Sequence, residues 1–330
     1  MKKVYVKDLT VGTTAQGHFS VLEKRYINYQ RNGAPAAGLV MTLGDKTGRI
    51  SAVAWNEALV ADGTYKQDDI VEIVGRVQDY RGDRQIYLEA VRKAALSEID
   101  PADFSGQAPR PVQEMWQELM GFIGSVKDPS LTWLLRRFFT DASYAEEADL
   151  FRKVPAGRDV HHAYIGGLLE HSLEVAEYVD HMCRVQGSML NRDLLIAGAL
   201  LHDAAKIWEY DFKSFSFEFT DRGRLLGHLV MGTELVGRLV AETPDFPTLL
   251  GQELQHMVIS HHGQKEWGSA EEPKTINAVA LHLADLSSSR LAQVERIVKD
   301  TLSNDERWSP WDRRFERSFM VTGRGEPREE

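Results

Sequence analysis

The adjacent pair His202-Asp203 is the feature of the sequence that says most about chemistry. The pair directly follows the apolar run Leu194–Leu201, while His171 precedes it and Asp285 follows it in segments with helical spacing of apolar residues. A buried pair of imidazoles beside two carboxylates is costly unless a cation satisfies them. Histidine with aspartate favours manganese, iron or zinc over calcium. These four residues are therefore candidate ligands of a divalent metal.

Five histidines lie between this pair and Asp285, and of these we take His228, His261 and His262 as candidates and His256 and His282 as packing or surface residues. The three candidates would furnish a second metal position, and Asp203 could bridge two ions because a carboxylate has two oxygens. A single histidine in a helix is more often a packed core residue than a ligand. The metal prediction therefore depends on the whole spaced set.

Lys206 follows Asp203 by three residues and lies on the same side of a helix. Its ammonium could hold a phosphate or the leaving oxygen, and we take Asp203 and Lys206 as the candidate catalytic residues. An ion pair with Asp203 on a solvated face would produce the same spacing. Both interpretations of Lys206 stay open at this point.

The 330 residues exceed what one hydrophobic core usually organises, so we expect more than one domain. Residues 1–95 show short apolar alternation broken by turns, which predicts strands over 17–28, 38–43, 49–55, 69–79 and 84–95. A helical segment over 57–66 separates the third strand from the fourth. This order is typical of an all-β OB-fold barrel, whose face and loops bind oligonucleotides.

Residues 96–111 combine proline, glycine and charge without periodicity, which predicts a linker. Residues 112–302 have helical spacing of apolar residues and predict an all-α domain. The tail, 303–330, interleaves tryptophan and phenylalanine with arginine. It could cap the helical domain, join subunits of a homo-oligomer or touch a substrate strand, and we favour packing.

The charge distribution bears on the type of substrate. The net charge is −10, but residues 1–95 carry a net +3 and residues 96–330 a net −13. A modest positive excess therefore lies where a polyanion would bind, and the acidic part holds the metal ligands. The single cysteine, Cys183, and the lack of a long apolar run predict a cytoplasmic protein without a membrane segment.

Aromatic and arginine side chains of the predicted barrel could stack bases and contact phosphates. We single out Tyr26, Arg25, Trp55 and Arg81, although a barrel buries alternate strand positions, so that about half of these aromatic residues would instead be core. The wider set is Tyr26, Tyr29, Trp55, Tyr80 and Tyr87 with Arg25, Arg31, Arg76, Arg81 and Arg84. In the second domain, His161 and His162 are candidate phosphate contacts, or residues at the entry to the helix that contains His171.

The order His, His-Asp, His, His-His, Asp resembles the HD phosphohydrolase superfamily. With the OB pattern and the phrases His161–His171 and Ser260–Gly263, the chain looks like the YhaM-type 3′→5′ exoribonucleases over nearly its whole length. The resemblance implies that His171, His202, Asp203 and Asp285 are the core metal ligands. It also implies that His228 and His261 or His262 hold a second ion, and that manganese stimulates removal of nucleotides from 3′ ends.

The expected function is therefore metal-dependent 3′→5′ exonuclease hydrolysis of single-stranded RNA, with DNA as an open alternative, to nucleoside 5′-monophosphates. One or two ions, with manganese expected, would activate water and neutralise charge on the phosphate. One alternative is an HD phosphohydrolase acting on a small nucleotide or a cyclic dinucleotide. Another is a nucleic-acid-binding protein with an idle HD domain.

Overall fold

The structure is a computed structural model that describes residues 4–31, 34–61, 63–67, 69–80, 82–95, 98–99, 103–104, 110–157, 164–211, 218–303 and 306–321. Two compact units make up the chain. The first comprises Met1–Gln107 with Tyr210–Thr220, and the second comprises Ala108–Glu209 with Asp221–Glu330. Across the described ranges, no helix is long and apolar enough to cross a bilayer.

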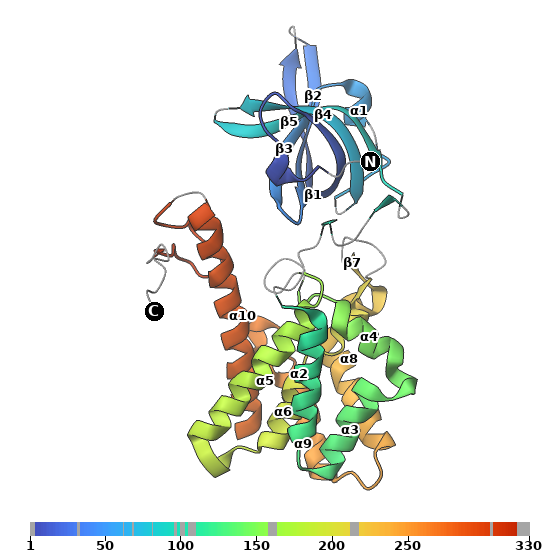
Figure 1. The fold of residues 1–330 in the computed structure, drawn as a ribbon, viewed down its shortest axis with the longest axis vertical. Helices are drawn as coiled ribbons and strands as arrows, with labels where there is room; N and C mark the ends of the chain where they lie inside the picture. The colour runs from blue at the N-terminus through green and yellow to red at the C-terminus, as the bar shows by residue number, and fades with distance from the viewer. Residues whose placement is uncertain are drawn as a thin grey trace. The chain divides into compact units, whose positions relative to one another are not determined.

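Five strands of the first unit close into a barrel, in the order β1-β2-β3-β5-β4 (Figure 1). Adjacent strands are antiparallel except β3 and β5, which are parallel. The elements are β1 (Thr14–Arg31), β2 (Ala34–Asp45), β3 (Gly48–Ala54), α1 (Glu57–Ala61), β4 (Ile70–Tyr80) and β5 (Asp83–Lys93). This order, with α1 between β3 and β4, confirms the predicted OB-fold.

Alternation of apolar residues along the strands builds the barrel core. In β2, Leu39, Met41 and Leu43 are fully buried, and Phe19 and Val21 of β1 meet them inside. Each such aliphatic or aromatic side chain contributes about 1.5–3 kcal/mol by leaving water. The predicted first strand, 17–28, was shorter than β1 at both ends. The extra residues are mostly polar, and backbone pairing extends the strand beyond the apolar pattern on which the prediction rested.

Part of the predicted linker belongs to the barrel unit. Asp103 is buried, and its carboxylate accepts a hydrogen bond from the Tyr5 hydroxyl at 2.7 Å. The Asp103 carbonyl also accepts a hydrogen bond from the backbone N–H of Lys46 at 2.9 Å. These two contacts attach the chain to the barrel well after its last strand, and nothing in the local composition of the segment indicates them.

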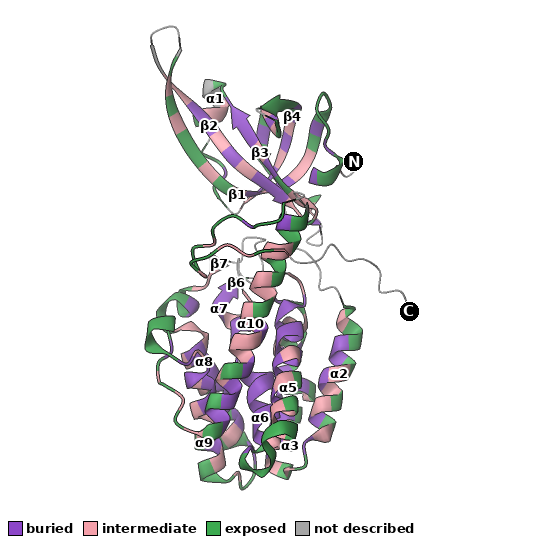
Figure 2. Ribbon diagram, turned by 90° about the vertical axis from the view of Figure 1, so that its left-hand side faces the viewer, coloured by how far each residue is buried: buried purple, intermediate pink, exposed green. Residues whose placement is uncertain are grey.

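The second unit is a bundle of helices around α6. Its helices are α2 (Val112–Ser125), α3 (Pro129–Thr140), α4 (Ala145–Lys153), α5 (Gly167–Gln186), α6 (Arg192–Leu201), α7 (Lys206–Glu209), α8 (Asp221–Glu242), α9 (Thr248–Ser260) and α10 (Ile276–Ser303). Every residue of α6 from Leu194 to Leu201 is buried, as the purple ribbon in Figure 2 shows. A helix that is apolar all round belongs in a core. The side chain of Asn191 caps its first turn by accepting from Leu194 N–H.

Two short segments depart from a purely helical pattern. A hairpin of β6 (Tyr210–Asp211) and β7 (Glu218–Phe219) interrupts the helical sequence, and it was not predicted. After α10, residues 306–321 fold back with bridges at Trp308–Met320 and Asp312–Arg317. The Arg290 guanidinium of α10 lies 5.0 Å from the ring centre of Phe315, so this segment packs against α10.

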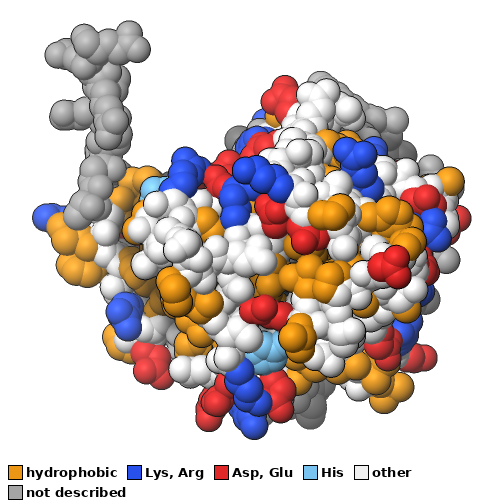
Figure 3. All heavy atoms as spheres, turned by 90° about the horizontal axis from the view of Figure 1, so that it is seen from below, with side chains coloured by type: hydrophobic (Ala, Val, Ile, Leu, Met, Phe, Trp, Pro, Cys, Tyr) orange, Lys and Arg blue, Asp and Glu red, His pale blue; other side chains and the backbone are white. Residues whose placement is uncertain are grey.

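On the face that Figure 3 draws, acidic and basic side chains are interspersed with apolar patches.

Candidate metal centre

Four of the predicted ligands meet in the interior of the helical unit. His171 lies on α5, Asp285 lies on α10, and His202 and Asp203 occupy the turn that follows α6. The Nε2 atom of His171 is 3.1 Å from Nε2 of His202 and 3.2 Å from Oδ1 of Asp285. It is 3.5 Å from Oδ2 of Asp203. We call these four residues the first cluster.

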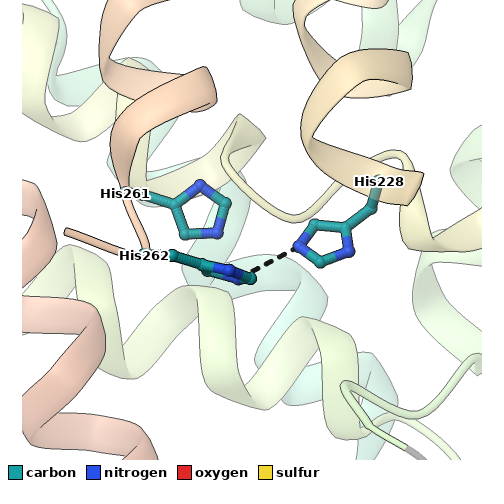
Figure 4. A group of neighbouring side chains, drawn as sticks. All are labelled: His228, His261 and His262. Carbon is teal, nitrogen blue, oxygen red and sulfur yellow. Dashed lines mark hydrogen bonds between the residues drawn. The ribbon is translucent and has the colours of Figure 1, made fainter. Parts of the chain in front are cut away.

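The other three predicted imidazoles, His228, His261 and His262, form a second cluster (Figure 4). The Nε2 atoms of His228 and His262 face each other at 3.3 Å. The Nε2 atoms of His228 and His261 lie 3.4 and 3.5 Å from Oδ1 of Asp203. The structure therefore brings all seven predicted ligands together around one carboxylate, from helices and turns that are far apart in the sequence.

Asp203 is the residue that the two clusters share. Its Oδ2 faces the first cluster and its Oδ1 faces the second. The residue is 2% exposed, and within the described part of the chain its Oδ1 has no hydrogen-bond partner. A buried carboxylate oxygen without a donor is unfavourable unless a cation lies beside it. The two oxygens of Asp203 are thus arranged so that each could bind a cation in one of the two clusters.

Four of the imidazoles are anchored through Nδ1, which leaves Nε2 directed at the clusters. The Nδ1 atoms of His202 and His261 lie 2.8 and 2.7 Å from the carbonyls of Ala199 and Val258. The Nδ1 atom of His171 lies 2.9 Å from Ser288 Oγ, and that of His228 lies 3.0 Å from Glu209. Donation from Nδ1–H fixes the tautomer that carries the Nε2 lone pair, as in metal-ligating histidines.

The donor set fits divalent cations. Two nitrogens bound to one ion at about 2.1 Å lie roughly 3.2 Å apart when their angle is near 100°. The observed Nε2–Nε2 separations of 3.1 and 3.3 Å agree with that geometry. Imidazoles with ionised carboxylates suit manganese, iron or zinc better than calcium. The two clusters are therefore candidate positions for divalent metal ions.

The protonation states of Asp203 and His262 also suit a cation. Burial would raise the pKa of Asp203, but the Lys206 ammonium and the His202 imidazole outweigh burial and hold that pKa well below its usual value. Burial lowers the pKa of His262 to about 3, and repulsion from the two neighbouring imidazoles acts in the same direction. An ionised carboxylate and a neutral imidazole are the forms that coordinate metals.

Lys206 is both ion-paired and buried. Its Nζ lies 2.6 Å from Oδ2 of Asp203, and the residue is 8% exposed. The three-residue spacing therefore does produce an ion pair with Asp203, but in the interior and not on a solvated face. This positive charge lies beside the shared carboxylate, and its use in binding phosphate stays a prediction.

The barrel candidates divide between two faces of β1. Paired residues of antiparallel strands share a face, and Arg25 pairs with Val40 while Tyr26 pairs with the buried Leu39. Arg25 therefore points outward, and Tyr26 lies on the opposite face although it is 55% exposed. Trp55 lies outward beyond β3, against Gly38. Arg81, His161 and His162 lie outside the described residues.

Sequence reasoning missed two residues that hold ligands in place, Ser288 and Glu209. Ser288 follows Asp285 by three residues, so helical spacing could have indicated that both face one site. Its hydroxyl donates to Glu174 at 2.6 Å, which leaves its oxygen to accept from His171. Glu209 is nineteen positions from its partner His228, and no local pattern relates the two.

Comparisons with known proteins identify families along the chain. The sequence matches the HD domain family over residues 168–289 and an OB-fold nucleic acid binding domain family over residues 33–94. A family described as a putative helicase matches residues 135–193, which overlaps the start of the HD match. Among solved structures, the second OB-fold domain of replication protein A from Methanococcus maripaludis aligns with 29% of this chain and 99% of its own, at 20% identity and a TM-score of 0.25.

Curated relatives cover most of the chain. The 3′-5′ exoribonuclease YhaM of Listeria monocytogenes is 31% identical over 298 residues, which is 89% of this chain and 91% of the relative. The protein of the same name from Bacillus velezensis is 33% identical over 270 residues, covering 81% of this chain and 82% of the relative. At this identity, and across both the barrel and the metal centre, the chain belongs to the YhaM family of 3′-5′ exoribonucleases.

Proposed function

We propose that this protein is a manganese-dependent 3′→5′ exoribonuclease that hydrolyses single-stranded RNA to nucleoside 5′-monophosphates in the cytoplasm. The observation that carries the proposal is the position of Asp203 between two clusters of imidazole nitrogens. Phosphodiester hydrolysis at two metals uses such a shared carboxylate. The names of the YhaM relatives support the substrate and the polarity.

In this proposal each residue of the centre has a defined task. His171, His202 and Asp285 would hold one ion with Oδ2 of Asp203, and the second cluster would hold another with Oδ1. Bound ions supply Lewis acidity toward the phosphate and the attacking water. Lys206 contributes a fixed positive charge close to the non-bridging oxygens. A water nucleophile that releases the 3′ oxygen leaves the phosphate on the 5′ side of the departing nucleotide, which gives a 5′-monophosphate.

The outer face of the barrel supports binding of single strands. The strand register places one row of residues around all five strands of the barrel, with an arginine on β1, another on β4 and a tyrosine on β5. Trp55 and Tyr29 lie in the adjacent rows, with ring centres 5.0 Å apart and edge to face. Such rings stack unpaired bases and the arginines contact phosphates. The row is Arg25, Val40, Val53, Tyr87 and Arg76.

We further propose that the RNA-binding domain comprises residues 1–95 together with the attached segment through Phe104. The catalytic domain would then span 112–302, as the sequence predicts, with residues 306–321 of the tail packed on α10. Tyr26, on the other face of β1, would lie outside the main platform. His161 and His162 remain candidates for contact with the terminal nucleotide.

A time course on 5′-labelled single-stranded RNA tests the proposal directly. With manganese, the label should move through successively shorter products, and unlabelled nucleoside 5′-monophosphates should accumulate. A strand that ends in a stable 3′ hairpin should resist, because paired bases hide their faces from stacking side chains. A DNA strand of the same sequence and bis-p-nitrophenyl phosphate serve as parallel substrates.

Three results would contradict the assignment. Internal fragments at the earliest times would indicate an endonuclease, and equal degradation of blunt duplex would exclude a single-strand requirement. Faster hydrolysis of a cyclic dinucleotide than of the oligonucleotide would favour the small-nucleotide alternative.

A further inference from the structure

Glu209 is a buried carboxylate at the end of α7 that has no part in the proposed reaction. Its Oε1 accepts two hydrogen bonds from one residue, His228: one from the backbone N–H and one from Nδ1, both at 3.0 Å. Its Oε2 also lies 3.0 Å from that Nδ1. Glu209 is 5% exposed, so these contacts are shielded from water.

The backbone around His228 explains why a carboxylate is suited to this place. Gly227 has φ 69° and ψ 163°, which breaks α8 and makes His228 the first residue of a new helical segment. The N–H groups that open a helix have no partner within it, and negative charge is favourable there. Glu209 thus satisfies one of these N–H groups and orients the ring with the same carboxylate.

Packing holds Glu209 in position. A Cβ atom on Gly223 would lie 2.2 Å from the backbone carbonyl oxygen of Glu209, so the first part of α8 lies directly against α7. Both partners are therefore fixed by their own backbones: α8 resumes at His228 and α7 ends at Glu209. The contact does not depend on a flexible surface side chain.

The four anchored imidazoles differ in what anchors them. His202 and His261 donate to backbone carbonyls, and His171 meets the neutral hydroxyl of Ser288. Among these four described histidines, His228 alone meets a carboxylate directly through Nδ1. A carboxylate raises the basicity of the opposite ring nitrogen and fixes the ring orientation more strongly than a neutral acceptor does.

We propose that Glu209 is a positioning residue that sets the metal affinity of the second cluster. It keeps His228 protonated at Nδ1, with Nε2 directed at His262 (Figure 4). The same Nε2 is directed at Oδ1 of Asp203. The first cluster has its own anchors and does not depend on Glu209. This role rests on the proposed two-ion centre. It adds that Glu209 sets the metal affinity of the second cluster and not that of the first.

The test is manganese titration of the full-length, chelator-stripped protein by calorimetry, for the wild type and for Glu209→Gln and Glu209→Ala. Wild type should show two sites. Glu209→Gln keeps an acceptor oxygen but removes the charge, and it should weaken one site by about 10-fold and leave the other unchanged. Glu209→Ala removes the acceptor as well and should weaken the same site by up to about 100-fold.

Glu242→Gln is the control, because Glu242 lies on α8, as His228 does, and accepts hydrogen bonds from Tyr144 and Arg137 away from the centre. It should leave both sites unchanged. A second readout is the nitrogen chemical shifts of His228 in metal-free protein. These shifts should report protonation at Nδ1 in wild type and a mixture of tautomers in Glu209→Ala.

Different failures have different meanings. If wild type binds two ions and Glu209→Gln and Glu209→Ala bind both as tightly, the positioning role is wrong and the two-ion centre stands. If Glu209→Gln weakens both sites equally, or lowers the melting temperature of metal-free protein far more than Glu242→Gln does, Glu209 has a general structural role and the inference is wrong. If wild type itself binds no manganese, the proposed function fails first.

Discussion

In the proposed function, the metal centre and the outer face of the barrel are two regions that act on one substrate. In the centre, buried ligands are held by further hydrogen bonds, and Asp203 serves both clusters. On the barrel, Trp55 is 37% exposed and Tyr29 is partly buried, and the two rings support each other edge to face. Because its ligands are buried and shared, we expect single substitutions in the centre to abolish hydrolysis. On the barrel face, several residues would each contribute part of the binding of RNA. The predictions below test that difference.

The largest effect is expected for Asp203→Asn. The change hardly alters side-chain volume, but it removes the negative charge that both clusters share. Loss of a residue that merely supports a metal ligand costs about 10- to 100-fold, so loss of this ligand should exceed 100-fold on every substrate. Hydrolysis of RNA and of bis-p-nitrophenyl phosphate should fall together while circular dichroism is unchanged. Near wild-type turnover with metal still bound would disprove the centre.

Removal of metal is expected to act on the same region. Treatment with a chelator should abolish hydrolysis of both substrates, and added manganese should restore it. Binding of an uncleavable single strand, measured by fluorescence anisotropy, should change far less, because the barrel face contains no metal ligand in this proposal. If the chelator abolished strand binding as well, the separation of the two regions would be wrong.

Deletion of residues 1–107 should have the converse effect. The shortened protein should still hydrolyse bis-p-nitrophenyl phosphate, but its KM for a long single strand should rise by at least about 100-fold, since each stacked base contributes about 1–3 kcal/mol. Thermal melting must first show a cooperative transition for the helical unit. An unchanged KM for the long strand would show that the barrel is not the platform.

A smaller effect is expected for Trp55→Ala. Loss of one stacking ring should raise the KM for single-stranded RNA by about 5- to 150-fold, with little change in turnover of the small phosphodiester. Tyr26→Ala is the internal comparison, because Tyr26 lies on the opposite face of β1 and should raise KM less. A larger effect at Tyr26 than at Trp55 would place the platform on the other face.

The smallest effect is expected for Gly38→Ala. A Cβ atom at this position would lie 2.6 Å from the indole ring of Trp55, so the ring must shift outward. We expect a rise in KM in the same direction as for Trp55→Ala but smaller, because the ring is displaced and not removed. The double variant should bind no worse than Trp55→Ala alone, and additive effects would show that Gly38 acts independently of the ring.

Much of the fold could be predicted because the spacing of apolar residues that indicates a strand or a helix repeats over many residues. Alternation along β2 and the apolar run of α6 are strong patterns, and the structure confirms a barrel followed by a helical bundle. The attachment of Asp103 to the barrel and the hairpin of β6 and β7 could not be predicted. Each depends on a few hydrogen bonds whose partners lie elsewhere in the chain or within very short strands.

The same distinction holds within the site. The candidate metal ligands could be recognised because few side-chain types bind metals, and the pairs His202-Asp203 and His261-His262 stand out in the stretch from His171 to Asp285. The residues that hold those ligands are ordinary ones, such as Ser288 and Glu209, and many serines and glutamates elsewhere look the same. The opposite faces of Arg25 and Tyr26 depend on the register of β1 with β2, which includes a shift between Val21 and Glu23 that the sequence does not reveal.

The position of Asp203 between the clusters also has a thermodynamic consequence. One carboxylate contributes an oxygen to each cluster, so an ion at either position alters the charge and the orientation that the other ion meets. Such coupling is reciprocal: whatever factor the first ion imposes on the affinity for the second, the second imposes on the first. Manganese titrations of this protein should therefore yield a coupling free energy as well as two affinities, and that coupling should change when Asp203 is replaced.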